Sequence, residues 1–195
     1  MGEMRAFDVA TDTTGKAHEI LNEGYKAVGV YLRKDRCSKS MIDGLHSLVI
    51  KVFSIWESGY PTKASYFSIA KGHEDGANAC HFAASIGQPK GTEIFTAFDF
   101  DASEQEIDGP CLDYMKAFRF ECQNAGYVAS AYGSGDLLSD YIRQGVCHSG
   151  FLAQSTGWGG YQAFTRQCSI LQGPSETVIG LDVDLDTIFD PRVLW

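Results

Sequence analysis

Eight short apolar runs alternate with amphipathic stretches along this chain, and glycine or proline separates many of them. Strands that alternate with helices favour a parallel sheet, and eight such strands favour a closed barrel. We therefore predict an α/β fold, a small (β/α)8 TIM-like barrel that forms a single domain over residues 1–195. The predicted strands cover residues 5–10, 27–32, 51–56, 92–101, 127–132, 150–155, 169–172 and 177–185.

The chain has 195 residues. Because barrels of this kind usually need ~250 residues, several of the helices must be short. The alternative architecture is an open, doubly wound sheet. Nucleotide-binding sheets of that type carry a G-x-G-x-x-G turn after the first strand, and no such turn occurs here. The closed barrel is therefore the preferred prediction.

The charge balance argues against nucleic acid as a partner. The formal net charge is −9, and the densest basic cluster is the short RKDR run at 33–36. Proteins that bind duplexes normally present a basic patch to the phosphates. No apolar run approaches the length that spans a membrane, and no signal peptide precedes the first strand. We expect a protein that stays in the cytoplasm of the producing cell until it is released.

Cysteine and histidine spacing predicts neither a metal site nor a cofactor site. None of the six cysteines forms a C-x-x-C pair, and the five histidines are scattered without a pair of ligand spacing. We expect the cysteines to be reduced, buried side chains.

Polar residues end most of the predicted strands. Active sites of (β/α)8 barrels lie at the C-terminal ends of the strands, so these side chains are candidates for the site. The acidic candidates are Asp8, Glu57, Asp99, Asp101 and Asp184. The candidates for substrate binding are Arg33, Tyr132, Gln154, Trp158, Gln172 and Asp182.

Side-chain alternation predicts which of these acids meet. Residues two apart in a strand share a face, so Asp99 and Asp101 should point together, and Asp182, Asp184 and Asp186 should do the same. In a closed barrel the eighth strand pairs with the first, which places Asp184 beside Asp8. Crowded carboxylates raise one another's pKa and create an acid beside a base, as glycoside hydrolysis requires.

Simpler interpretations exist for single residues. An aspartate that ends one strand is more often a helix N-cap than a catalyst, so Asp8 alone is weak support for a site. Asp186 and Asp190 are expected to lie in loops or caps. Trp158 and Tyr161 are candidates for stacking on sugar rings, but each could instead pack on the rim of the barrel. The coincidence of acids on three strands is what favours function.

Several segments resemble a glycoside-hydrolase-like barrel family, long labelled a domain of unknown function, that is related to the family-25 muramidases. The resemblance covers nearly the whole chain, and the G-x-P-x-G-T-x-I-[YF] lead into D-x-D is its most specific part. The segments are FDVA at 7–10, GHEDGANACHFAASIGQPKGTEIFTAFDFDA at 72–102, AYGSG at 131–135, AQSTGWGG at 153–160 and LDVDLD at 181–186.

The resemblance implies roles for individual acids. Asp8, Asp99 and Asp184 match the aspartates of the muramidases on strands one, four and eight. Asp101 stands where the muramidases carry an acidic Glu, one methylene longer. We expect Asp101 to be the general acid and Asp99 to orient or stabilise the charged centre, with Glu57 as the substitute acid.

Three functions remain open at this point. The first is a muramidase-like peptidoglycan glycosidase of the phage endolysin type, acting as a monomer on peptidoglycan or a related polysaccharide. The second is a catalytically silent barrel that binds glycan, which the missing Glu favours. The third is a metal-dependent hydrolase whose aspartates would hold Mg²⁺ or Ca²⁺.

Overall fold

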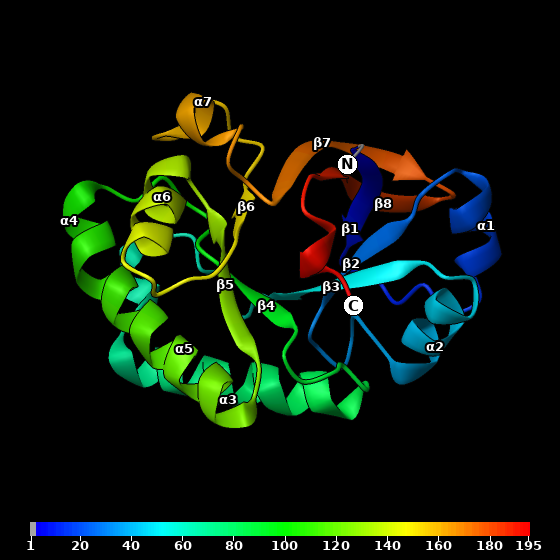
Figure 1. Ribbon diagram of the computed structural model, residues 1–195, viewed down its shortest axis with the longest axis horizontal. Helices are drawn as coiled ribbons and strands as arrows, with labels where there is room; N and C mark the ends of the chain where they lie inside the picture. The colour runs from blue at the N-terminus through cyan, green and yellow to red at the C-terminus, as the bar shows by residue number, and fades with distance from the viewer. Residues whose placement is uncertain (1–2) are drawn as a thin grey trace.

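The computed structural model describes residues 3–195, which form one closed barrel of eight strands surrounded by helices (Figure 1). The strands follow one another around the barrel in sequence order, which confirms the predicted fold class. They are β1 Met4–Val9, β2 Ala27–Tyr31, β3 Lys51–Trp56, β4 Glu93–Ala97, β5 Val128–Gly133, β6 Gly150–Leu152, β7 Ile170–Val178 and β8 Leu181–Ile188.

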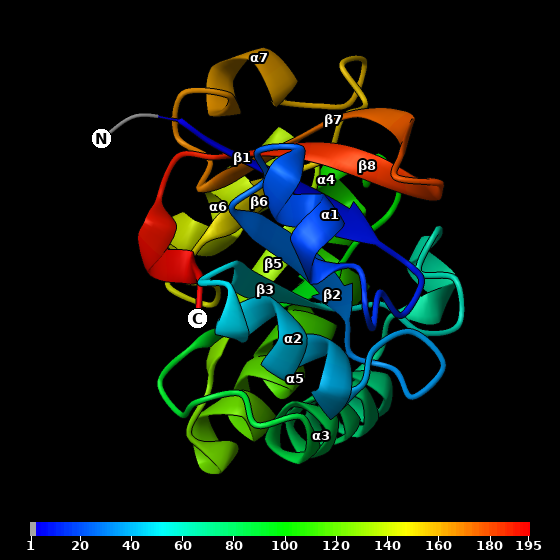
Figure 2. The ribbon, with the colours of Figure 1, turned by 90° about the vertical axis from the view of Figure 1, so that its right-hand side faces the viewer.

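Helices cover the outside of the barrel, and most of them are short, as the chain length predicts. In Figure 2 the two longest, α3 and α5, lie side by side below the strands. The α-helices are α1 Ala17–Asn22, α2 Lys39–Ser47, α3 Ile69–Ser85, α4 Glu104–Glu106, α5 Leu112–Ala125, α6 Gly135–Arg143 and α7 Tyr161–Phe164. Single turns of other helix types cover η1 Ala64–Tyr66, η2 Ile107–Cys111 and η3 Pro191–Val193.

The last strand runs against the others, which corrects the expectation of an all-parallel sheet. Strands β1 to β7 pair in parallel, whereas β8 is antiparallel to both β7 and β1. Ile179 and Gly180 adopt positive φ angles of 49° and 76° and join β7 to β8 in a tight hairpin. The strand predicted over 177–185 therefore crosses this turn, and its first two residues belong to β7.

The core has two layers that follow the alternation of side chains along the strands. Inward-facing residues fill the barrel itself, and a larger cluster lies between strands and helices. On β2, Gly29 faces inward, where an added Cβ would lie 2.4 Å from the Phe53 ring and 2.6 Å from Cβ of Asp8. Glycine at this position lets a large ring and a site carboxylate share the barrel interior.

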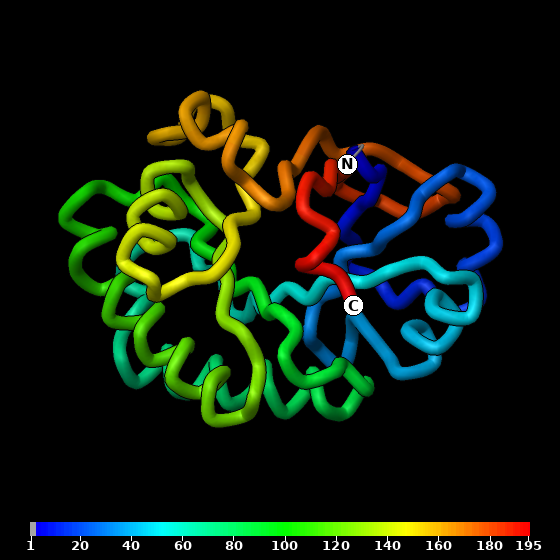
Figure 3. The backbone as a smooth tube through the Cα atoms, viewed as in Figure 1, coloured from blue at the N-terminus to red at the C-terminus, as the bar shows by residue number. Residues whose placement is uncertain are grey.

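The end of the chain covers the barrel end opposite the strand C-termini. Trp195 exchanges backbone hydrogen bonds with Val52 at the start of β3, and its indole donates to Ser54 Oγ at 3.1 Å. Val193 packs among the inward-facing residues. In Figure 3 the C-terminal segment accordingly runs beside β3. One end of the barrel is thus filled, which leaves a cavity at the other.

All six cysteines are free and buried. Cys80 on α3 and Cys122 on α5 bring their sulfur atoms to 3.8 Å without a covalent bond. Across residues 3–195, no helix combines the length and apolar character needed to cross a bilayer.

Candidate active site

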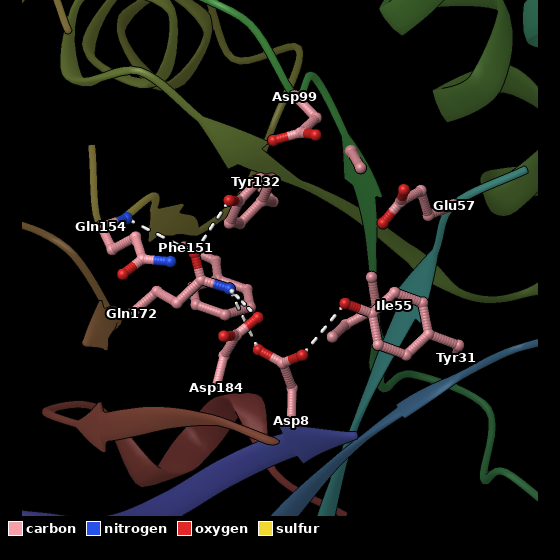
Figure 4. Close-up of a pocket in the computed structure, with 11 residues that line it drawn as sticks. Asp8, Tyr31, Ile55, Glu57, Asp99, Tyr132, Phe151, Gln154, Gln172 and Asp184 are labelled. Atoms are coloured by element: carbon pink, nitrogen blue, oxygen red, sulfur yellow. Dashed lines mark hydrogen bonds between the residues drawn. The ribbon is translucent and has the colours of Figure 1, made fainter. Parts of the chain in front are cut away.

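A cavity of about 270 Å³ opens at the C-terminal ends of the parallel strands (Figure 4). Four carboxyl side chains line it, from β1, β8 and the segments that follow β3 and β4. The lining residues are Asp8, Tyr31, Ile55, Glu57, Ala97, Asp99, Tyr132, Phe151, Gln154, Gln172 and Asp184. The predicted concentration of acids at the barrel mouth is therefore present.

Asp8 and Asp184 form one pair of acids. They are register partners in the β1–β8 ladder, as predicted from closure of the barrel. Gln172 on β7 donates its amide nitrogen to Asp8 Oδ2 at 3.2 Å and to Asp184 Oδ2 at 3.4 Å. The Gln172 oxygen accepts from Tyr132 Oη at 2.8 Å and from the backbone nitrogen of Gln154 at 3.4 Å. These two donors orient the amide so that its nitrogen faces the carboxylates.

The pKa of Asp8 is raised to about 7. Burial is the main cause, since the residue is only 2% exposed, and the negative charge of Asp184 adds to it. Hydrogen bonds from Gln172 and from Tyr31 Oη, the latter at 3.0 Å, act in the opposite direction. Asp8 can therefore exchange a proton near neutral pH.

Glu57 and Asp99 form a second pair across the cavity from the first (Figure 4). Burial raises the pKa of Glu57, and the charge of Asp99 raises it further, while Arg33 and Arg36 lower it. Burial and the charge of Asp184 raise the pKa of Asp99. The backbone nitrogen of Asp99 donates to the Pro61 carbonyl at 3.0 Å, which ties the loop after β4 to the loop after β3.

The structure does not place Asp101 in the cavity, so its predicted convergence with the other acids is wrong. Strand β4 ends at Ala97, and the two-residue alternation does not continue to Asp101. The Asp101 side chain is exposed and accepts a hydrogen bond from the Gly159 backbone nitrogen at 2.8 Å. It connects the loop after β4 to the loop after β6.

The predicted binding residues divide into three groups. Tyr132, Gln154 and Gln172 line the cavity with the acids. Arg33 lines a neighbouring cavity. Trp158, Tyr161 and Asp182 are not among the lining residues of either cavity. Asp182 is exposed and accepts from Thr177 across the β7–β8 hairpin, beyond the mouth, and Tyr161 packs against the outer core layer.

Three residues near the acids were missed from the sequence. Tyr31, the last residue of β2, donates to Asp8, and its two-residue spacing from inward-facing Gly29 was the available signal. Ser175 on β7 donates to Asp184 Oδ1. Asp186 was expected in a loop or cap, yet it is 5% exposed within β8, and neither carboxyl oxygen has a hydrogen-bond partner.

Asp186 is a further buried acid close to Asp8 and Asp184, although it does not line the acidic cavity. Burial raises its pKa well above the usual range, and the charges of Asp8 and Asp184 add to the rise. A neutral carboxylic acid is the form that an apolar barrel interior favours. Its position two residues from Asp184 in the D-x-D-x-D run was the signal for an inward-facing side chain.

The arrangement suits proton transfer to and from a bound molecule. Asp8, Glu57 and Asp99 have raised pKa values, so protonated and ionised groups can occur together in one small space. Within residues 3–195, no three His, Cys, Asp or Glu side chains are grouped in the way that metal ligands are.

A closed α/β barrel with acids clustered at the ends of its strands is compatible with a glycoside-hydrolase-like domain. Residues 18–185 match the family model described as "Rv2525c-like, glycoside hydrolase-like domain". The chain belongs to this family.

The curated relative YbfG of Bacillus subtilis, an uncharacterized protein, is 29% identical over 174 residues. The match covers 80% of this chain but 24% of YbfG, so the chain spans about a quarter of that relative's length.

Solved structures share the fold at low sequence identity. The Tat-secreted protein Rv2525c of Mycobacterium tuberculosis, in complex with L-tartrate, has a TM-score of 0.83 at 15% identity, with 98% of this chain and 97% of that chain covered. The modular autolysin LytC of Streptococcus pneumoniae, in complex with a synthetic peptidoglycan ligand, has a TM-score of 0.62 at 13% identity, covering 96% and 47%. The catalytic domain of endolysin ply40 from bacteriophage P40 of Listeria monocytogenes has a TM-score of 0.59 at 11% identity, covering 98% and 96%.

Proposed function

We propose that this domain hydrolyses glycosidic bonds in the peptidoglycan of the bacterial cell wall, in the manner of a muramidase. The observation that carries the proposal is the convergence of Asp8, Glu57, Asp99 and Asp184 on one cavity. Glycosidases of the common type need one carboxylic acid that holds a proton and a second carboxylate that stabilises or attacks the sugar centre. The likeness in fold to LytC and to the ply40 catalytic domain supports a cell-wall substrate and a lysin role.

Glu57 is the proposed general acid. Its pKa is raised by burial and by Asp99, so it retains a proton to higher pH than an ordinary glutamic acid. It is half-buried, and no hydrogen bond within the described residues engages its carboxyl oxygens. Asp8 is less accessible because it is 2% exposed and its two oxygens accept from Tyr31 and Gln172.

The reaction follows from these positions. Glu57 gives its proton to the glycosidic oxygen as the bond between that oxygen and the anomeric carbon breaks. Asp99, ionised, stabilises the positive charge that develops on the sugar, or orients the sugar's acetamide if that group attacks. Water then adds to the anomeric carbon and returns a proton to Glu57, so the acid is regenerated.

The proposal is tested by digesting purified peptidoglycan and analysing the products by mass spectrometry. New muramic reducing ends are expected, and glucosamine reducing ends would indicate a glucosaminidase instead. Glu57→Gln should lower turnover by about 10²–10⁴-fold, the usual contribution of a general acid. Asp101→Asn is the matched control and should stay near the parent rate. Glu57→Gln at the parent rate would exclude Glu57 as the acid.

A glycan-binding barrel without activity is the second candidate. It is favoured by one observation, the position of Asp101 outside the cavity, because the muramidases that the chain resembles carry an acidic Glu at that point. Retention of the protein on peptidoglycan without any new reducing ends would support this function over hydrolysis.

A further inference from the structure

A second cavity, of about 470 Å³, adjoins the acidic cavity and differs from it in charge. Tyr31 and Glu57 line both cavities, so the two share a wall. The second one is also lined by Arg33, Arg36 and Tyr60. Cations thus border an acidic site in a chain whose net charge is −9.

The two arginines are held in place by one exposed acid. Arg33 donates to Asp35 through Nε at 3.3 Å and through a terminal nitrogen at 3.2 Å. Arg36 Nε lies 3.3 Å from Asp35, and a terminal nitrogen of Arg36 donates to the Ala10 carbonyl. Among residues 3–195, Asp35 is the one carboxylate within salt-bridge distance of the two arginines, and some of their guanidinium N–H groups have no protein acceptor.

Tyr60 supplies an aromatic surface beside these cations. Its side chain is 83% exposed although it is large and partly apolar, and its backbone has φ of 61°, a conformation that costs a residue with a Cβ some free energy. Strained backbone at an exposed aromatic points to a binding role. The next residue, Pro61, accepts a hydrogen bond from the backbone nitrogen of Asp99. The loop that carries Tyr60 is therefore tied to the segment that carries Asp99.

We propose that the cavity lined by Arg33, Arg36 and Tyr60 is a subsite for a carboxylate-bearing unit of the glycan, one position away from the bond that is cleaved. The planar guanidinium groups match a carboxylate, and the tyrosine ring matches the apolar face of a sugar. The inference rests on the proposed function for its choice of a glycan, whereas the carboxylate follows from the arginines themselves.

Occupation of this subsite has a consequence for Glu57. The charges that act on this residue are those of Asp99 and Asp184, which raise its pKa, and of Arg33 and Arg36, which lower it. A substrate carboxylate between the arginines offsets their positive charge and removes part of the lowering. A substrate that carries a carboxylate therefore raises the pKa of the proposed acid further than a neutral analogue does.

The test compares two probes by calorimetry on the intact protein: the disaccharide N-acetylglucosaminyl-N-acetylmuramic acid and its methyl ester. We expect the acid to bind about tenfold more tightly than the ester, in the range of a charge-assisted hydrogen bond, with an advantage that shrinks as salt is added. Arg33→Gln should abolish the difference. Lys34→Gln removes the same charge from an exposed neighbouring side chain that does not line the cavity, and should preserve it.

Three results would overturn the subsite: equal binding of acid and ester, binding of neither, or a preference that survives in Arg33→Gln with an unchanged melting temperature. Failure of the subsite proposal can be distinguished from failure of the proposed hydrolase activity. Preference for the acid without any cleavage of peptidoglycan leaves the subsite standing and removes the hydrolase. Cleavage with equal binding of the two probes does the reverse.

Discussion

Asp8 and Asp184 lie directly opposite each other in the antiparallel ladder that closes the barrel, and a single amide, that of Gln172, donates to both. Burial raises the pKa of Asp8 to about 7, and the negative charge of the neighbouring Asp184 adds to the rise. This relationship makes both the stability and the chemistry of the site dependent on pH.

The melting temperature should rise as the pH is lowered from 8 to 5. The pKa of Asp8 is about 7 in the folded protein, whereas an unperturbed aspartic acid in the unfolded chain has a pKa of 3.8. Between these two pH values the folded protein therefore binds more protons than the unfolded chain. Stability is then greatest at the low end of the window and is lost as the pH rises through about 7. Because 1 kcal/mol moves the melting temperature of a domain of this size by about 2–4 °C, calorimetry should resolve the change.

Asp8→Asn should remove much of that dependence, because the amide does not titrate. Asp182→Asn, on the same strand as Asp184 but exposed, is the control and should retain the parent's slope. If Asp8→Asn melts with the parent's pH dependence, the relevant proton belongs to another acid of the cluster.

Asp101→Ala should affect stability rather than chemistry. Its carboxylate accepts from Gly159 and joins two loops at the barrel mouth. Loss of one such hydrogen bond costs about 0.5–1.5 kcal/mol, and Asp101→Asn should cost less because its oxygen still accepts. Thermal unfolding of both variants measures the difference. A fall in turnover of 10²-fold or more with unchanged melting would return Asp101 to the role of acid.

Gly29→Ala should destabilise the barrel by about 1–3 kcal/mol, the usual cost of overpacking a filled core. The added methyl group would lie within 2.6 Å of both Phe53 and Asp8. Gly44→Ala is the matched control, because this glycine lies within α2 and a methyl group added to it would meet nothing within 4 Å. Alanine there should stabilise the helix by about 0.5–1 kcal/mol. Urea titration compares the two variants, and an unchanged midpoint for Gly29→Ala would contradict the close packing around this glycine.

Reducing agent should leave the melting temperature unchanged. All six cysteines are free and buried, and the closest pair, Cys80 and Cys122, is separated by 3.8 Å. A thiol count under denaturing conditions should give six. A transition that collapses when dithiothreitol is added would show that stabilising disulfides form in the protein.

The strands and the meeting of Asp8 with Asp184 were predictable because both depend on local periodicity and on closure of the barrel. The inward parity of the D-x-D-x-D run was also visible, although Asp186 was assigned to a loop or cap because its burial depends on the barrel around it. The hairpin before β8 was missed since Ile179 interrupts no apolar pattern, and only Gly180 marked the turn.

The position of Asp101 depended on contacts between distant segments. Alternation along a strand predicts direction only while the strand continues, and β4 ends when the Asp99 backbone turns to Pro61. Neither that hydrogen bond nor the one from Gly159 to Asp101 is encoded in local spacing. The arginine-lined cavity was missed for the same reason: Arg33 was predicted to bind substrate, but its alignment with Arg36 and Tyr60 requires two loops to meet.

Because β8 runs antiparallel to β7, one part of the barrel mouth is formed by a hairpin whose length can be changed. In an all-parallel barrel, residues inserted at the C-terminal end of the last strand lengthen a loop that leads away to a helix. Here β7 and β8 rise past the mouth as a hairpin, and Lys16 donates to the carbonyl of Ile179 at its tip. Pairs of residues added at that tip would lengthen the wall beside Asp184 while the ladders that close the barrel keep their register, so the hairpin is a natural place for engineering longer or shorter substrates into this scaffold.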